Sequence, residues 1–330
     1  MSFLELSEAM RAEMDRAPAI VRPSRFWTEL NEKHESRIAS SGIENFRRTL
    51  AKDYFTWMRV LPWDSQIRFL IREIGPLAVM KCAAHTFTKH KSIPLAESLA
   101  LNFLTRLLWT YVSDRYPVIA SIPEPTFGNP PNITVDGRVV SQDLANSFLE
   151  FSSYEPVFKG TICELGGGYG RNAYVAAQLA DFDRYIFSDI PPALAVAQEF
   201  ISKTFPESKI FGFRSFDSYD EVAEELSASK FAFLLPHQLS LLPDSSVDLF
   251  INISSLHEME LTQVNYYLAQ IRRLVARGGH FYLKAWRHSN NPDEAEQIDE
   301  KDYDLSGFAE IFKRAAPVQT RFFETLQVKQ

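Results

Sequence analysis

The stretch Thr161–Arg171 constrains the fold of this chain more than any other. It reads T-I-C-E-L-G-G-G-Y-G-R, and a run that favours a helix, 172–179, follows it directly. A short apolar strand that ends in an acid and enters a glycine turn before a helix is typical of a ligand-binding βα unit. Glycines let the backbone approach a ligand closely and take angles that a Cβ would forbid. The stretch therefore predicts an α/β fold with a ligand at this turn.

The spacing of the glycines separates two classes of ligand. A dinucleotide fingerprint needs G-x-G-x-x-G, and counting from Gly166 the third glycine would fall on Arg171. The chain instead offers E-x-G-x-G-x-G, a pattern that resembles the first motif of S-adenosylmethionine-dependent methyltransferases. That resemblance implies S-adenosylmethionine as the cofactor. The cofactor-binding residues expected in this turn are Glu164, Gly166, Gly167, Gly168 and Gly170.

Composition narrows the class of protein. The chain has 330 residues, of which 45% are hydrophobic and 23% charged, as expected of a globular protein with a full core. Its net charge of −7 argues against nucleic acid as a partner, because phosphate contacts need clustered Lys and Arg. The two cysteines, Cys82 and Cys163, predict neither a disulfide framework nor a metal site. No apolar run approaches the roughly 20 residues that span a bilayer, and the N-terminus lacks the pattern of a signal peptide. We therefore expect a cytoplasmic protein.

The chain changes character near residue 155. Helical periodicity dominates before it, whereas strands and helices alternate after residue 160, as in a doubly wound parallel sheet. We expect a mostly helical cap at residues 1–155, on the acceptor side, and a Rossmann-like cofactor domain at 156–330. The N-terminal helices are predicted at 26–33, 42–59, 65–85, 95–112 and 141–151, with Ser141 as an N-cap. In the second half, strands are predicted at 161–165, 184–188, 231–235, 247–253, 279–285 and about 318–328, and helices at 171–180, 192–204, 218–227, 260–276 and 302–314.

Residues that follow the predicted strands extend the expected cofactor site. Ligands of open α/β sheets bind at the carboxyl ends of the strands. Asp189 and Ile190 follow the second strand, where such folds place an acid that binds a ribose diol. Asp189 has an alternative role as a cap of the helix that opens at Pro191-Pro192. His237, Gln238 and Asn252 complete the expected cofactor contacts, and ordinary polar loop residues are the alternative for the first two.

The strand at 247–253 leads into a polar cluster suited to chemistry. Transfer of a methyl group to a hydroxyl benefits from a base that removes the hydroxyl proton. Histidine suits this role because its pKa lies near neutrality. We therefore expect His257 as the base and Glu258 as an accompanying carboxylate, although both can instead begin the following helix. Ser255 is expected to contact the acceptor. Trp286, at the end of the next strand, is expected to stack on a sugar ring or on the adenine. No metal-ligand spacing stands out.

Several segments together resemble the bacterial sugar O-methyltransferase family, with a class I methyltransferase fold. The resemblance implies a sugar or glycan hydroxyl as the acceptor, in surface polysaccharide biosynthesis. It also implies that Asn129, Gln142, Asp143 and Asn146 face the acceptor, while loop and helix-cap structure remains the alternative for them. The matching segments are Pro23–Trp27, Gly42–Phe46, Gly128–Pro130, Ser141–Ser147, Glu164–Gly170, Asp189–Pro192, Asn252–Met259 and Asp302-Tyr303.

Other functions stay open at this point. A methyltransferase of a non-sugar small molecule fits the same motifs. A nicotinamide-dependent oxidoreductase is disfavoured by Arg171, which stands where a third glycine is required. A non-catalytic protein with a cofactor fold is disfavoured by the polar cluster after residue 252. The sequence leaves the acceptor's identity open, and a homo-oligomer as well.

Overall fold

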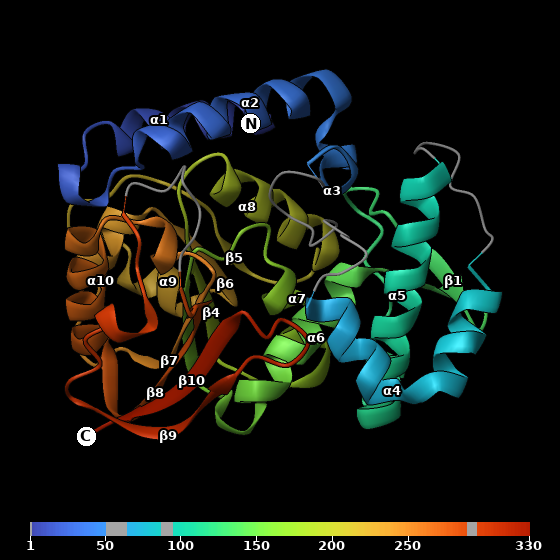
Figure 1. Ribbon diagram of the computed structural model, residues 1–330. Helices are drawn as coiled ribbons and strands as arrows, with labels where there is room; N and C mark the ends of the chain where they lie inside the picture. Colours follow the sequence, from blue (N-terminus) through green and yellow to red (C-terminus); the bar gives the residue numbers. More distant parts are fainter. Residues whose placement is uncertain (1, 51–64, 87–94, 289–295) are drawn as a thin grey trace.

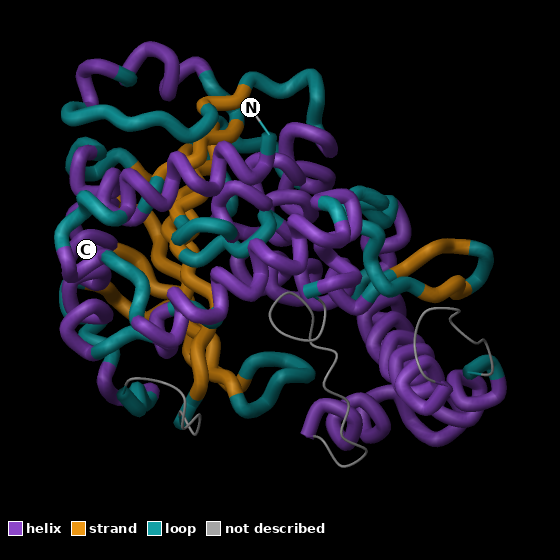
Figure 2. The backbone as a smooth tube through the Cα atoms, turned by 90° about the horizontal axis from the view of Figure 1, so that it is seen from above, coloured by secondary structure: helices purple, strands orange, loops and turns teal. Residues whose placement is uncertain are grey.

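The computed structural model describes residues 2–50, 65–86, 95–288 and 296–330. In this part of the chain, eight strands form one sheet in the order β5-β6-β4-β3-β7-β8-β10-β9 (Figure 1). Helices pack around the sheet, and a small hairpin, β1-β2, lies apart from it (Figure 2). The strands are β1 (Ile133–Val135), β2 (Arg138–Val140), β3 (Thr161–Leu165), β4 (Arg184–Ser188), β5 (Ile210–Phe211), β6 (Phe231–Leu234), β7 (Val247–Ile253), β8 (Val275–Trp286), β9 (Phe308–Ala315) and β10 (Phe322–Lys329).

The helices of the first half surround one side and one end of the sheet. In Figure 1, α1 and α2 lie across the top of the molecule, while α4 and α5 pack against each other at its right. In the described part of the predicted helix 42–59, Gly42 ends α2 and the helix α3 is short, and residues 51–59 lie outside the described ranges. The helices are α1 (Phe3–Met14), α2 (Arg25–Ser41), α3 (Phe46–Thr49), α4 (Ser65–Ala84), α5 (Leu95–Arg115), α6 (Gln142–Tyr154), α7 (Arg171–Leu179), α8 (Ala193–Thr204), α9 (Ala223–Ala228) and α10 (Leu261–Leu274).

The predicted doubly wound α/β architecture is confirmed. Strands β5, β6, β4, β3, β7 and β8 run parallel, and β3 lies between β4 and β7. The chain moves from β3 to β4 on one side and reaches β7 later on the other, so the strand order reverses at β3. Ligands of open α/β sheets bind beside such a switch point, at the carboxyl ends of the strands. The glycine turn that follows β3 occupies this place.

The prediction of a helix over 302–314 is wrong. Residues 308–315 form β9, which pairs antiparallel with β10, and β10 pairs antiparallel with β8. Ala309, Glu310, Lys313 and Arg314 favour a helix locally, but pairing with β10 satisfies the backbone and overrides that preference. β9 is the edge strand, and most of its side chains are exposed or half-buried, so its sequence lacks the apolar run of the inner strands.

Two elements of the first half extend what the sequence predicted. The helix α1 begins with a capping box in which Ser2 and Glu5 exchange hydrogen bonds. Its buried face, with Leu6, Met10 and Met14, belongs to the main core, and α1 packs on α8. The hairpin β1-β2 turns at Asp136-Gly137, where both residues have positive φ, as a two-residue hairpin turn requires.

Candidate functional site

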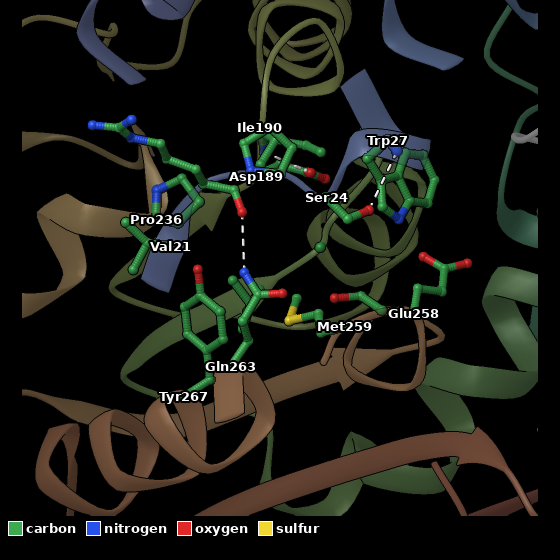
Figure 3. A pocket seen from close by; sticks show the side chains of 15 residues that line it. Val21, Ser24, Trp27, Asp189, Ile190, Pro236, Glu258, Met259, Gln263 and Tyr267 are labelled. Carbon is green, nitrogen blue, oxygen red and sulfur yellow. Dashed lines mark hydrogen bonds between the residues drawn. The ribbon is translucent and has the colours of Figure 1, made fainter. Parts of the chain in front are cut away.

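A pocket opens at the carboxyl ends of four neighbouring strands, β6, β4, β3 and β7 (Figure 3). It contains about 530 Å³ of empty space, part of which is open to solvent. Its lining joins residues that follow these strands to residues from the N-terminus and from α10. The lining residues are Val21, Arg22, Pro23, Ser24, Trp27, Leu165, Gly166, Asp189, Ile190, Pro236, Ser255, Glu258, Met259, Gln263 and Tyr267.

The glycine turn brings backbone to the pocket wall at Gly166. This residue has φ +76°, and a Cβ added there would lie 2.3 Å from the Cβ of Ser255. Any side chain would therefore meet both backbone strain and a clash with the loop after β7. Gly168 and Gly170 also have positive φ, and Gly170 is the N-cap of α7. Of the predicted glycine contacts, Gly166 lines the pocket, whereas Gly167, Gly168 and Gly170 shape the turn behind it.

Asp189 places a buried carboxylate at the pocket. Its Oδ2 accepts a hydrogen bond from the Gly168 N–H at 2.8 Å, and its Oδ1 accepts one from the Ile190 N–H at 2.7 Å. Burial raises the pKa of Asp189 to about 7, although these two N–H groups act in the opposite direction. No side chain caps the start of α8, so the carboxylate serves the pocket and the turn rather than that helix. Asp189 and Ile190 both line the pocket, as the cofactor prediction requires.

Glu164 lies beneath the glycine turn and away from the pocket lining. Its Oε1 accepts a hydrogen bond from Asn172 at 2.8 Å, and its Oε2 accepts one from the Tyr185 hydroxyl at 2.7 Å. Burial raises the pKa of this carboxyl, while the two donors oppose that effect. These contacts join β3, α7 and β4 from below.

The remaining predicted cofactor contacts lie outside the lining. Gln238 accepts a hydrogen bond from the Leu235 N–H and donates one to the Arg214 carbonyl, so it shapes the loop after β6. His237 lies 3.6 Å from the Glu13 carboxylate of α1. Asn252 donates to the Leu165 carbonyl at 2.9 Å and to Ser255 Oγ at 3.1 Å. Asn252 thus joins the ends of β3 and β7, and it positions Ser255 for the pocket.

The structure separates the two residues expected to carry base chemistry. Glu258 lines the pocket, with 24% of its side chain exposed. His257 is buried, and its ring lies edge-on to Trp286 and Phe322, with centroids 6.1 Å away in each case. Burial lowers the pKa of His257 to about 3, so the ring is neutral at physiological pH and a weak base. Trp286 stacks on Phe322 at 4.3 Å and, like His257, does not line the pocket.

The predicted acceptor residues of the first half also lie outside the pocket lining. Asn129 is exposed and donates to Asn45 at 2.8 Å. Gln142, Asp143 and Asn146 are buried on α6. Gln142 donates to Thr105, 3.3 Å away. Asp143 accepts a hydrogen bond from the Tyr169 hydroxyl at 3.1 Å and pairs with Arg47 at 3.4 Å. Of the predicted acceptor contacts, Ser255 is the one that lines the pocket.

A buried network of charges surrounds Asp143 on the α6 side of the glycine turn. Arg47 pairs with Glu124 at 3.0 Å as well as with Asp143. Arg171, the first residue of α7, pairs with Glu150 at 2.5 Å, and Glu150 pairs with Lys284 at 2.7 Å. Burial raises the pKa of Glu150, but Arg171 and Lys284 outweigh it, so the net shift lowers that pKa. We call these six residues the buried charge network; its three cations balance its three carboxylates.

Sequence reasoning missed the part of the pocket that the N-terminus supplies. The segment Ile20–Trp27, which we call the strap, crosses the pocket between α1 and α2 and contributes five lining residues. Figure 3 shows Trp27 beside Glu258 at one end and Val21 beside Pro236 and Tyr267 at the other. The available signals were Pro23 and Ser24, because Ser24 Oγ caps α2 by accepting from the Trp27 N–H. Pro23 and Ser24 predict where α2 begins, but they do not predict that this segment lines the pocket.

Among residues 2–50, 65–86, 95–288 and 296–330, no group of three or more His, Cys, Asp and Glu residues could hold a metal ion. In the same ranges, no helix combines the length and the apolar character that crossing a bilayer requires.

Comparison with known proteins gives distant structural likenesses. No protein-family model matches the chain, and no curated protein does. A SAM-dependent methyltransferase from Aquifex aeolicus is 14% identical with a TM-score of 0.37, over 55% of this chain and 89% of that one. The 1,6-didemethyltoxoflavin-N1-methyltransferase of Burkholderia thailandensis, solved with S-adenosylhomocysteine, is 14% identical with a TM-score of 0.38, over 57% and 79%. Phosphoethanolamine N-methyltransferase 1 of Haemonchus contortus is 16% identical with a TM-score of 0.38, over 58% and 43%.

Proposed function

We propose that this protein is an S-adenosylmethionine-dependent O-methyltransferase whose acceptor is a sugar or glycan hydroxyl. The observation that carries the proposal is the pocket at the switch point of the sheet. Gly166, from the E-x-G-x-G-x-G motif, and Asp189, predicted from its place after the second strand, both line that pocket. The resemblance of the sequence segments supports the sugar acceptor.

The residues present fit the cofactor. S-adenosylmethionine carries a ribose diol and a cationic sulfonium, and it supplies an electrophilic methyl group when bound. The Asp189 carboxylate matches the diol, and the absence of a side chain at Gly166 leaves room beside Ser255 that a Cβ would fill. Ile190, Pro236 and Tyr267 give the pocket apolar walls of the kind that adenine prefers.

Glu258 is the residue that we propose as the base. It is the carboxylate that lines the pocket at the end away from Tyr267, beside Trp27 (Figure 3). A carboxylate there can accept the proton of an acceptor hydroxyl. His257 is neutral, and its Nε2 lies 3.9 Å from Glu258 Oε1, so it packs behind the carboxylate. In this mechanism His257 positions Glu258 and does not take the proton.

Titration calorimetry tests the cofactor part of the proposal. We expect S-adenosylhomocysteine to bind the protein and NADH not to bind. Binding of NADH without binding of S-adenosylhomocysteine would contradict the proposal and favour an oxidoreductase.

Labelled S-adenosylmethionine tests the acceptor part. Incubation with the protein and fractionated cell extracts should transfer label to a glycan or sugar-nucleotide fraction. Mild base should not release this label, because a methyl ether is stable to base. Transfer to a non-sugar small molecule would keep the methyltransferase and replace the acceptor.

A further inference from the structure

The strap reaches the pocket across a very long separation in sequence, and one side chain of α10 bonds to its backbone there. Gln263, in the first turn of α10, donates from Nε2 to the Ile20 carbonyl and to the Arg22 carbonyl, both at 3.0 Å. These contacts join residues 243 and 241 positions apart. Both Gln263 and the strap line the pocket. In Figure 3 a dashed line at Gln263 marks a hydrogen bond of its side chain.

Other contacts hold the strap as well: Trp27 is buried, and Arg22 Nε donates a hydrogen bond to the Ala17 carbonyl at 2.7 Å. Val21 is buried, and η1 (Ala19–Val21) packs against α10. Pro23 and Ser24 are half-buried, and the Ser24 hydroxyl caps α2 within the strap itself. On the α1 side, Glu13 accepts a hydrogen bond from Ser215 and lies near His237, so the preceding helix is anchored separately. The amide of Gln263 adds the hydrogen bonds that tie the Ile20 and Arg22 carbonyls to α10.

We propose that the strap is a gate over the cofactor pocket and that Gln263 is the positioning residue that latches it. With the latch made, Val21, Arg22 and Trp27 wall the pocket, so a bound cofactor should leave faster when the strap lifts. This inference rests on the proposed cofactor, because that cofactor is the ligand whose exchange the strap controls.

The latch can be removed without removing the helix start. Gln263 Oε1 accepts a hydrogen bond from the Glu260 N–H at 3.3 Å, which completes a capping box of α10. Gln263→Glu retains an oxygen for this cap but replaces the amide donor with an oxygen that faces two carbonyls. Asn265→Asp is the matched control, because it makes the same chemical change on an exposed position of the same helix.

Two measurements on the whole chain test whether Gln263 latches the strap. We expect Gln263→Glu to release S-adenosylhomocysteine about tenfold faster in stopped-flow displacement, a change equivalent to about 1.4 kcal/mol. Asn265→Asp should leave the rate unchanged. Hydrogen exchange followed by mass spectrometry should show faster exchange of the Val21, Arg22 and Trp27 amides in Gln263→Glu than in the control.

The outcomes distinguish the gate from the proposed function. If wild-type protein does not bind S-adenosylhomocysteine, the proposed function fails, and equal exchange of the strap amides in both variants then removes the latch as well. If the ligand binds but its release rate is unchanged in Gln263→Glu, the gate is overturned, whatever the exchange shows. Should Gln263→Glu fail to fold, Gln263→Ala, which adds no charge, gives the same two readings.

Discussion

The two sides of the glycine turn hold carboxylates in opposite ways. On the α6 side, Asp143 and Glu150 lie within the buried charge network, each beside a cation. On the pocket side, Asp189 accepts hydrogen bonds from backbone N–H groups, and no described Lys or Arg forms an ion pair with it. Burial raises the pKa of Asp189 to about 7 because no such cation offsets it. The paired carboxylates of the buried charge network stabilise the fold. Asp189, which has no cationic partner, can instead bind a polar or cationic ligand.

The largest effect should come from breaking the balance of the buried charge network. Arg47→Leu leaves Glu124 and Asp143 buried without their common partner, so the free energy of unfolding should fall by about 3–5 kcal/mol. Urea unfolding measures it. The triple variant with Glu124→Gln and Asp143→Asn should lose clearly less. A triple variant no more stable than the single one would show that the charges do not act as a set.

A carboxylate on the pocket side should instead control turnover. Glu258→Gln should lower the rate of methyl transfer by about 100-fold or more, in the range expected of a general base, and change S-adenosylhomocysteine affinity little. Release of S-adenosylhomocysteine with the identified acceptor measures the rate. Glu207→Gln, at an exposed position before β5, is the control. Full activity of Glu258→Gln would remove the pocket carboxylate from the mechanism.

Two glycines with similar φ can show how closely the pocket wall is packed. Gly166 has φ +76° and Gly137 has φ +79°, but a Cβ at Gly137 meets nothing within 4 Å. Gly137→Ala should cost about 1–2 kcal/mol of unfolding free energy from backbone strain. Gly166→Ala should cost about 1–3 kcal/mol more, because it also displaces Ser255. Thermal unfolding compares the two variants. Equal losses of unfolding free energy would mean that the loop after β7 moves to accommodate the Cβ at no energetic cost.

Asp189 should also give the stability of the protein a pH dependence. Its pKa rises from an ordinary 3.8 to about 7 on folding, so the folded state holds the extra proton between these values. The stability contributed by this group is therefore present at about pH 4 and is lost as the pH rises to about 7. Asp189→Asn should flatten that decline in urea unfolding. An unchanged slope would place the titration elsewhere.

Local signals predicted much of the fold and part of the pocket. The apolar run before Gly166 and the helix after it gave β3 and α7 almost to the residue, because both depend on neighbours in sequence. Asp136-Gly137 is a hairpin signal that could have located β1-β2. β9 depends on β10 for its structure, and no local pattern reveals that pairing.

The candidate site was harder to predict than the fold for the same reason. Asp189 follows from its place after a strand, whereas the burial of His257 follows from Trp286 and Phe322, which come from β8 and β10. Asn252 was placed at the correct strand end, but its amide is used to join β3 to β7. Position along a strand predicts which edge a residue reaches, while the direction of its side chain depends on distant packing.

The contact between the strap and α10 also sets an order of assembly. Ile20 leaves the ribosome before its partner Gln263, which follows 243 residues later. Contacts so distant in sequence form late and slowly, because the intervening chain must first be ordered. The glycine turn of the nascent protein can therefore form before the strap is fixed at the pocket. Binding of cofactor during synthesis should then be delayed until α10 has folded.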